Sequence, residues 1–176
     1  MKHSTIILPL LFLLMLLSCV NTNKKDNKQF VTDNPVDPFS QIEFDKAIAY
    51  DFPGNTMIPL IDSNGMVTKV VTKQVVLDSN QINEFRKILM DSTSFGELYM
   101  MDFYPHFGIV FYKNDKIIDH LEVSLICFNV FASFTIPEKE KKDHSYNALT
   151  PIGVNKIFKF CKKLGFTQYL DSVKLN

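Results

Sequence analysis

The sequence predicts an α+β fold: a mostly antiparallel sheet of about five or six strands with two helices packed on one face. Three observations lead to this prediction. Most of the chain after residue 42 consists of short segments in which apolar and polar residues alternate, as in half-buried strands. Two other segments carry apolar residues at helical spacing. Turns between neighbouring strand segments are short enough for antiparallel pairing.

The first strand segments come before the first helix. An alternating apolar set over residues 42–52 predicts a strand with its large apolar side chains in the core. Residues 57–62 and 66–76 flank the dipeptide Asn64-Gly65. Because Asn-Gly is strongly favoured in two-residue β-turns, we expect these two segments to form a hairpin.

A first helix is predicted after these strands. Asp78 or Ser79 is expected to cap its N-terminus, and Gln81 stands three residues after Asp78, which is the spacing of a capping box. One face of this helix is apolar and is formed by Ile82, Phe85, Ile88 and Leu89.

A second helix is predicted near the C-terminus. Thr150 and Pro151 suit its N-cap and first position, and Gly165 suits its end. Its apolar stripe is formed by Val154, Ile157, Phe158, Cys161 and Leu164. The charged residues 138–143 before this helix are expected to form a solvated loop.

A second predicted hairpin defines the register of the sheet. Its two alternating apolar sets are Phe107, Ile109 and Phe111 in one strand and Leu121, Val123, Leu125 and Cys127 in the next. A one-residue slip in pairing reverses the face of every side chain. The two sets therefore share a face only if the turn around Asn114-Asp115 has an odd length, and we expect three residues. After Cys127 the apolar phase shifts by one residue, which indicates a β-bulge near residues 126–128 or a region covered on both faces.

In this register four polar residues share the face opposite the apolar one: His106, His120, Glu122 and Ser124. Two imidazoles beside a carboxylate can bind a divalent metal or act in acid–base catalysis. Such residues are also expected on the solvent-exposed face of an antiparallel sheet that is covered on one side. We favour the exposed face, because nothing in the spacing makes the histidines converge, and we assign no catalytic residue, no metal ligand and no cofactor.

Cys127 and Cys161 both fall on apolar stripes, one at a strand end and one in the second helix. They can meet in the core as a disulfide, which an oxidising compartment would permit. They can equally be two buried thiols, and that alternative is favoured because free cysteine is often a small buried apolar residue.

The N-terminal segment predicts export from the cytoplasm. Lys2 gives it a positive head, and residues 6–17 are apolar apart from the imino acid Pro9. A helix of this length spans about 18 Å at 1.5 Å per residue, whereas a bilayer core needs about 30 Å. The segment therefore suits a secretory signal peptide better than an uncleaved anchor or a buried helix.

The end of this segment is similar to the lipobox of bacterial lipoprotein precursors. Its residues are Leu16, Leu17, Ser18 and Cys19, with a leucine three positions before the cysteine and a small residue directly before it. Leu17 is bulkier than the usual residue at its position. The resemblance implies that residues 1–18 are removed as a lipoprotein signal peptide, that the Cys19 thiol receives a diacylglyceryl group and that the new amine is acylated, for example with palmitate.

Three segments are predicted along the chain. Residues 1–18 are the signal peptide, residues 19–41 are the lipidated cysteine and a flexible tether, and residues 42–176 are one globular α+β domain. The tether would reach roughly 25 Å. By the same lipoprotein resemblance, Val20 favours the outer membrane over the inner one, because an aspartate at this position favours inner-membrane retention.

The folded part carries no strong catalytic signature. Lys plus Arg and Asp plus Glu each number 19, so the chain has no formal net charge and no reason to bind nucleic acid. It contains no G-x-S-x-G, P-loop, H-E-x-x-H or C-x-x-C motif. Residues 104–128 resemble a block of small bacterial lipoproteins through Pro105, Gly108 to Tyr112 and Ile126 to Phe128, and this resemblance implies no particular activity.

These observations predict a lipid-anchored protein of the cell envelope. Its membrane contact is the covalent lipid on Cys19, and its domain is expected to be a non-catalytic binding or interaction module for an envelope partner. The alternative is an envelope enzyme or metal-binding protein that uses the face carrying His106, His120 and Glu122.

Overall fold

The computed structural model describes residues 36–97, 102–141 and 147–167. The chain divides into two units, Met1–Asp33 and Asn34–Asn176, and every described residue belongs to the second. The predicted signal peptide, the lipobox with Cys19 and most of the predicted tether lie outside the described residues. Within the described ranges, no helix has both the length and the apolar character needed to span a bilayer.

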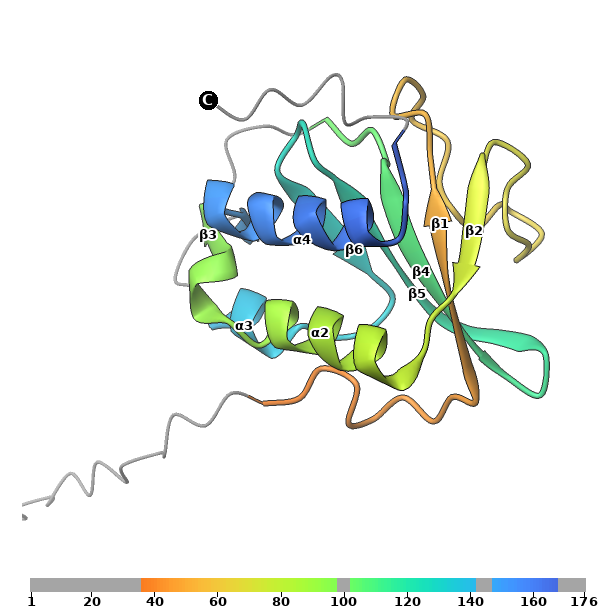
Figure 1. Ribbon diagram of the computed structural model, residues 1–176, viewed down its shortest axis with the longest axis horizontal. Helices are drawn as coiled ribbons and strands as arrows, with labels where there is room; N and C mark the ends of the chain where they lie inside the picture. The colour runs from red at the N-terminus through yellow and green to blue at the C-terminus, as the bar shows by residue number, and fades with distance from the viewer. Residues whose placement is uncertain (1–35, 98–101, 142–146, 168–176) are drawn as a thin grey trace, which may run out of the picture. The chain divides into compact units, whose positions relative to one another are not determined.

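The fold is α+β, as predicted. A five-stranded antiparallel sheet has the order β2-β1-β4-β5-β6 (Figure 1). Its strands are β1 (Lys46–Asp51), β2 (Lys73–Val76), β4 (Phe107–Lys113), β5 (Lys116–Ser124) and β6 (Asn129–Ala132). A separate two-stranded sheet pairs β3 (Phe95–Glu97) with β7 (Asn147–Leu149).

Two helices, α2 (Ser79–Leu89) and α4 (Pro151–Lys163), lie side by side across one face of the large sheet (Figure 1). Their predicted starts are confirmed: Asp78 forms a capping box with Gln81, and Thr150 caps α4 ahead of Pro151. After α4, Gly165 has a φ of +70°, a conformation that glycine adopts without strain.

Two shorter helices were not predicted. The 3₁₀ helix η2 (Ser92–Ser94) follows α2. The helix α3 (Pro137–Glu140) overlaps the first residues of the charged stretch 138–143, which was expected to be a solvated loop. Glu138 of α3 is buried and lies 2.6 Å from the Lys141 amine. The loop prediction is therefore wrong for the start of this stretch, because this carboxylate has a basic partner that allows its burial.

The central part of the sheet is buried on both faces. The main core lies between the sheet and the helices and contains, among others, Phe85, Leu89, Phe107, Ile157 and Phe160. A second cluster of Tyr50, Phe52, Leu60 and Val110 lies on the opposite face, beneath the segment of residues 53–72. Ala47 and Ala49, not the larger residues between them, face the main core, so the predicted inward face of β1 is reversed there.

The hairpin predicted around Asn64-Gly65 is reduced to a single bridge between Ile61 and Val67. Only residues 73–76 of its second half form a strand, and that strand pairs with β1 instead. The remaining residues of the segment 53–72 are irregular and cover the second face. Gly65 has a φ of +72°, but Asn64 does not have a positive φ, so the expected two-residue turn is not formed. Instead the Asp62 N–H donates to the Met66 carbonyl at 2.8 Å, across a connection of residues 63–65.

The register predicted for β4 and β5 is confirmed, but its cause differs from the prediction. Phe107 lies opposite Val123, so the two apolar sets do share a face. The turn has two residues, Asn114 and Asp115, both with positive φ, and a bulge beside Phe111 then shifts the register by one residue. A short turn plus a bulge thus has the same effect as the expected three-residue turn.

The phase shift after Cys127 arises from a tight turn and not from a bulge. Residues 125–128 connect β5 to β6, and Ser124 pairs with Asn129 on the two sides of the turn. Phe128 has a φ of +56°, which is unusual for a bulky residue. Its carbonyl accepts a hydrogen bond from the Leu149 N–H at 2.8 Å, which ties the turn to β7.

The folded part begins earlier than residue 42. Phe39 is only 4% exposed, and its ring packs against Phe44, Phe111 and Phe134 at centroid distances of 6.4, 5.1 and 5.9 Å. The guanidinium of Arg86 lies over the same ring at 5.6 Å. Residues 36–41, which the sequence analysis places in the tether, are therefore part of the packed domain.

Candidate functional site

The four polar residues singled out by the sequence do share one face of the sheet. Glu122 lies opposite Gly108 and His120 lies opposite Val110, whose side chain belongs to the second cluster. The expectation that this face is solvent-exposed is wrong: His106, Glu122 and Ser124 are 1%, 2% and 0% exposed. Only His120 is partly accessible, with 20% of its side chain exposed.

The segment of residues 53–72 covers this polar face, and two glycines, Gly54 in the segment and Gly108 in β4, allow it to lie close to the sheet. A Cβ added to Gly54 would lie 2.4 Å from the His106 ring, so the imidazole packs directly on that backbone. A Cβ added to Gly108 would lie 2.6 Å from Leu60, which occupies the space above this strand. Glycine at both positions permits a close approach that any other residue would block.

Glu122 is the most unusual group on this face. Its carboxylate accepts a hydrogen bond from the Leu60 backbone, and its Oε1 lies 3.7 Å from Nε2 of His120. Its Oε2 is buried and has no hydrogen-bond partner among the described residues. Burial raises the pKa of Glu122, and the Leu60 hydrogen bond opposes this change only in part.

Both histidines favour the neutral form. Burial lowers the pKa of His106, and a hydrogen bond with the Tyr104 backbone opposes this. The Leu125 N–H donates to Nδ1 of His106 at 3.3 Å. Burial likewise lowers the pKa of His120, against the opposing charge of Asp119.

The register separates the two histidines. Val110, and not His106, faces His120 across β4 and β5. His106 lies four residues before Val110, which corresponds to about 13 Å along an extended strand. In the described ranges no group of three or more His, Cys, Asp or Glu side chains is arranged to hold a metal ion. Of the four residues, the structure places the side chains of His120 and Glu122 3.7 Å apart. These two residues already share a face in the register predicted from the sequence.

Ser124 and the two cysteines have other surroundings. The Ser124 hydroxyl lies 3.4 Å from the Tyr104 N–H, which donates to it. Cys127 and Cys161 are both buried, and the structure records no disulfide between them.

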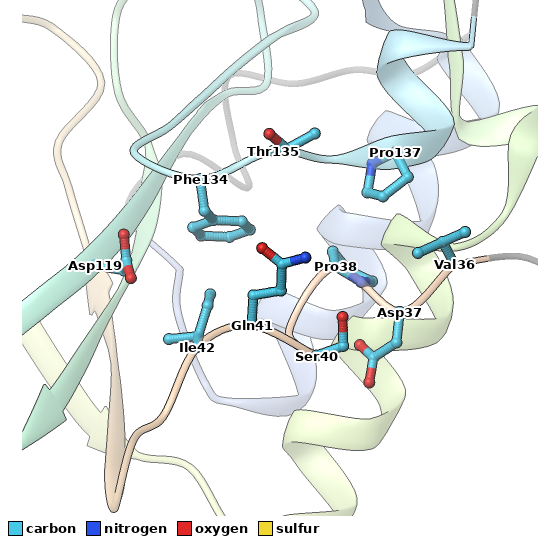
Figure 2. Close-up of a pocket in the computed structure, with 10 residues that line it drawn as sticks. All are labelled: Val36, Asp37, Pro38, Ser40, Gln41, Ile42, Asp119, Phe134, Thr135 and Pro137. Atoms are coloured by element: carbon cyan, nitrogen blue, oxygen red, sulfur yellow. The ribbon is translucent and has the colours of Figure 1, made fainter.

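A hollow of about 450 Å³, which was not predicted from the sequence, lies at the start of the folded part (Figure 2). One wall is the segment of residues 36–42, the other is the segment of residues 134–137, and Asp119 of β5 lies at one side. Residues 36–42 have no periodic pattern, and Phe134 continues the alternating apolar set that follows Cys127. The sequence therefore contains no pattern that marks this hollow.

Comparison with known proteins adds no assignment: no protein-family model, no curated protein and no solved structure matches the chain.

Proposed function

We propose that this protein is a lipoprotein of the cell envelope, anchored through Cys19, whose folded domain is a non-catalytic binding module. The observation that carries the proposal is the sequence Leu16-Leu17-Ser18-Cys19 directly after a short apolar segment with a positive head. Two or more acyl chains on one cysteine suffice for stable anchoring, whereas a single chain binds only marginally.

The placement of the folded part supports this arrangement. Its first described residue is Val36, so about 16 residues stand between the proposed lipid and the domain. Those residues are mainly Asn, Lys, Asp and Thr. A polar segment of this length would reach roughly 20–25 Å, which is enough to hold the domain next to the bilayer.

The module part of the proposal is supported by the hollow beside residues 36–42. It is open to solvent and combines apolar walls with polar side chains, as ligand sites do. One wall of the hollow is formed by the first described residues of the chain, which follow the proposed tether in the sequence.

The anchoring is tested by labelling cells with radioactive palmitate and by mass spectrometry of the mature N-terminus. The wild type should incorporate label and begin at a lipidated Cys19, and Cys19→Ala should do neither. Ser18→Ala is the matched control, because a small residue before the cysteine is kept. An intact precursor with an unmodified Cys19 thiol would overturn the proposal.

A second candidate function is supported by the pair of His120 and Glu122. A buried carboxylate of raised pKa that is 3.7 Å from a histidine is an arrangement that can move a proton or join a metal site. Calorimetric titration of zinc into the wild type and His120→Ala tests it. Tight binding that is lost in the variant would favour this function over the non-catalytic module.

A further inference from the structure

The hollow between residues 36–42 and residues 134–137 has the composition of a site for a cationic side chain. Its apolar walls are formed by Val36, Pro38, Ile42, Phe134 and Pro137. The Phe134 ring and the Gln41 amide project into it from opposite walls (Figure 2). One side of the Phe134 ring is occupied by the core, since Phe39 and Phe111 lie 5.9 and 5.8 Å away. The packing of Phe134 therefore holds its ring in place for a ligand.

Charge selects the kind of ligand. The lining contains two carboxylates, Asp37 and Asp119, and none of the ten lining residues is basic. Asp37 is neutralised by Arg86, whose Nε lies 3.2 Å from its Oδ1. In the described part of the chain, no Lys or Arg forms an ion pair with Asp119.

Asp119 is partly buried and keeps acceptor capacity. Its Oδ1 accepts a hydrogen bond from the Ser133 hydroxyl at 2.8 Å. The Gln41 side chain also lines the hollow, and its amide oxygen is a second possible acceptor. A carboxylate that forms no ion pair with a described Lys or Arg, at one side of an apolar hollow, disfavours an anion and favours a cation.

We propose that this hollow binds the side chain of a lysine or arginine presented by a partner protein. The aliphatic stem lies along Phe134 and the proline walls, and the charged end is held by Asp119 and the Gln41 oxygen. Long basic side chains pack in this way, with an apolar stem against apolar surface and a charged head at a polar group. This inference rests on the proposed function as a binding module and names the feature of the partner that it recognises.

The test titrates short peptides into the ¹⁵N-labelled full chain in neutral detergent micelles and follows the signals by NMR. The probes are acetyl-Ala-Lys-Ala-amide and acetyl-Ala-Arg-Ala-amide, and the control is acetyl-Ala-norleucine-Ala-amide. We expect saturable shifts of the Gln41 side-chain amide and the Thr135 N–H with the basic peptides only. Asp119→Asn should weaken this binding by roughly 5-fold. Asp115→Asn, the same change at a carboxylate outside the hollow, should leave it unchanged.

Three outcomes would overturn the inference. Equal shifts with the norleucine peptide would show that charge plays no part in recognition. Binding unaffected by Asp119→Asn would place the cation elsewhere. Saturable shifts confined to residues outside the hollow would refute this site but would still be consistent with a binding module. None of the three results changes the expected palmitate labelling of the wild type and Cys19→Ala, so failure of this inference can be distinguished from failure of the proposed anchoring.

Discussion

Replacing Phe39 with alanine tests directly whether the domain begins before residue 42. The Phe39 side chain is almost fully buried and contacts three other phenylalanine rings at 5.1–6.4 Å. Phe-to-Ala changes in cores cost about 3–5 kcal/mol of unfolding free energy. Because Phe39 lies next to the open hollow, its neighbours can relax and water can enter, so we expect the lower end, about 3 kcal/mol.

Urea unfolding of the full chain measures this loss. Far-UV circular dichroism and tyrosine fluorescence are suitable signals, because the chain has no tryptophan. With a slope of about 1.5–2 kcal/mol per molar urea, a loss of about 3 kcal/mol lowers the midpoint by roughly 1.5–2 M. Phe131→Ala is the matched control, since Phe131 is 55% exposed on β6, and it should cost less than about 1 kcal/mol.

A Phe39→Ala variant with the same midpoint as Phe131→Ala would refute the reasoning. Residues 36–41 would then contribute no packing energy and would belong to the tether. The hollow would not have a fixed wall on that side.

Two further predictions concern the helices and the buried carboxylate. Gly153→Ala should destabilise the domain by roughly 1–3 kcal/mol despite the better helix propensity of alanine, because the new Cβ would lie 2.3 Å from the Ser94 carbonyl oxygen. The control is Asn155→Ala at an exposed position of the same helix, which should be neutral or slightly stabilising in the same urea assay. Since the folded pKa of Glu122 is raised above its usual 4.5, the folded state binds this proton more tightly, and wild-type stability falls as pH rises from about 4.5 towards the folded pKa. Relative to the wild type, Glu122→Gln should therefore gain stability over this interval, with a slope of at most about 1.4 kcal/mol per pH unit, and a difference that is constant with pH would contradict the raised pKa.

The features that could be predicted from the sequence are those set by nearby residues. Asp78 with Gln81, and Thr150 with Pro151, identify both long helices, because capping groups act within one turn. That Phe107 and Val123 share a face follows from alternation, which fixes the face of every side chain. The bulge that produces this pairing could not be predicted, because a three-residue turn satisfies the same alternation.

The sequence predicts which four residues share the polar face, but it does not predict that this face is covered. The cause is the covering segment. Alternation in β4 and β5 places Glu122 and His120 on one face, but it carries no information about what lies over that face. The cover comes from residues 53–72, whose apolar Leu60 is neither in a strand nor in a helix. Its approach depends on the missing side chain of Gly108, a contact between residues 48 positions apart in the chain. Because Leu60 both shields Glu122 from water and donates the hydrogen bond to it, the same segment determines whether this carboxylate is an ordinary surface group or a buried acid of raised pKa.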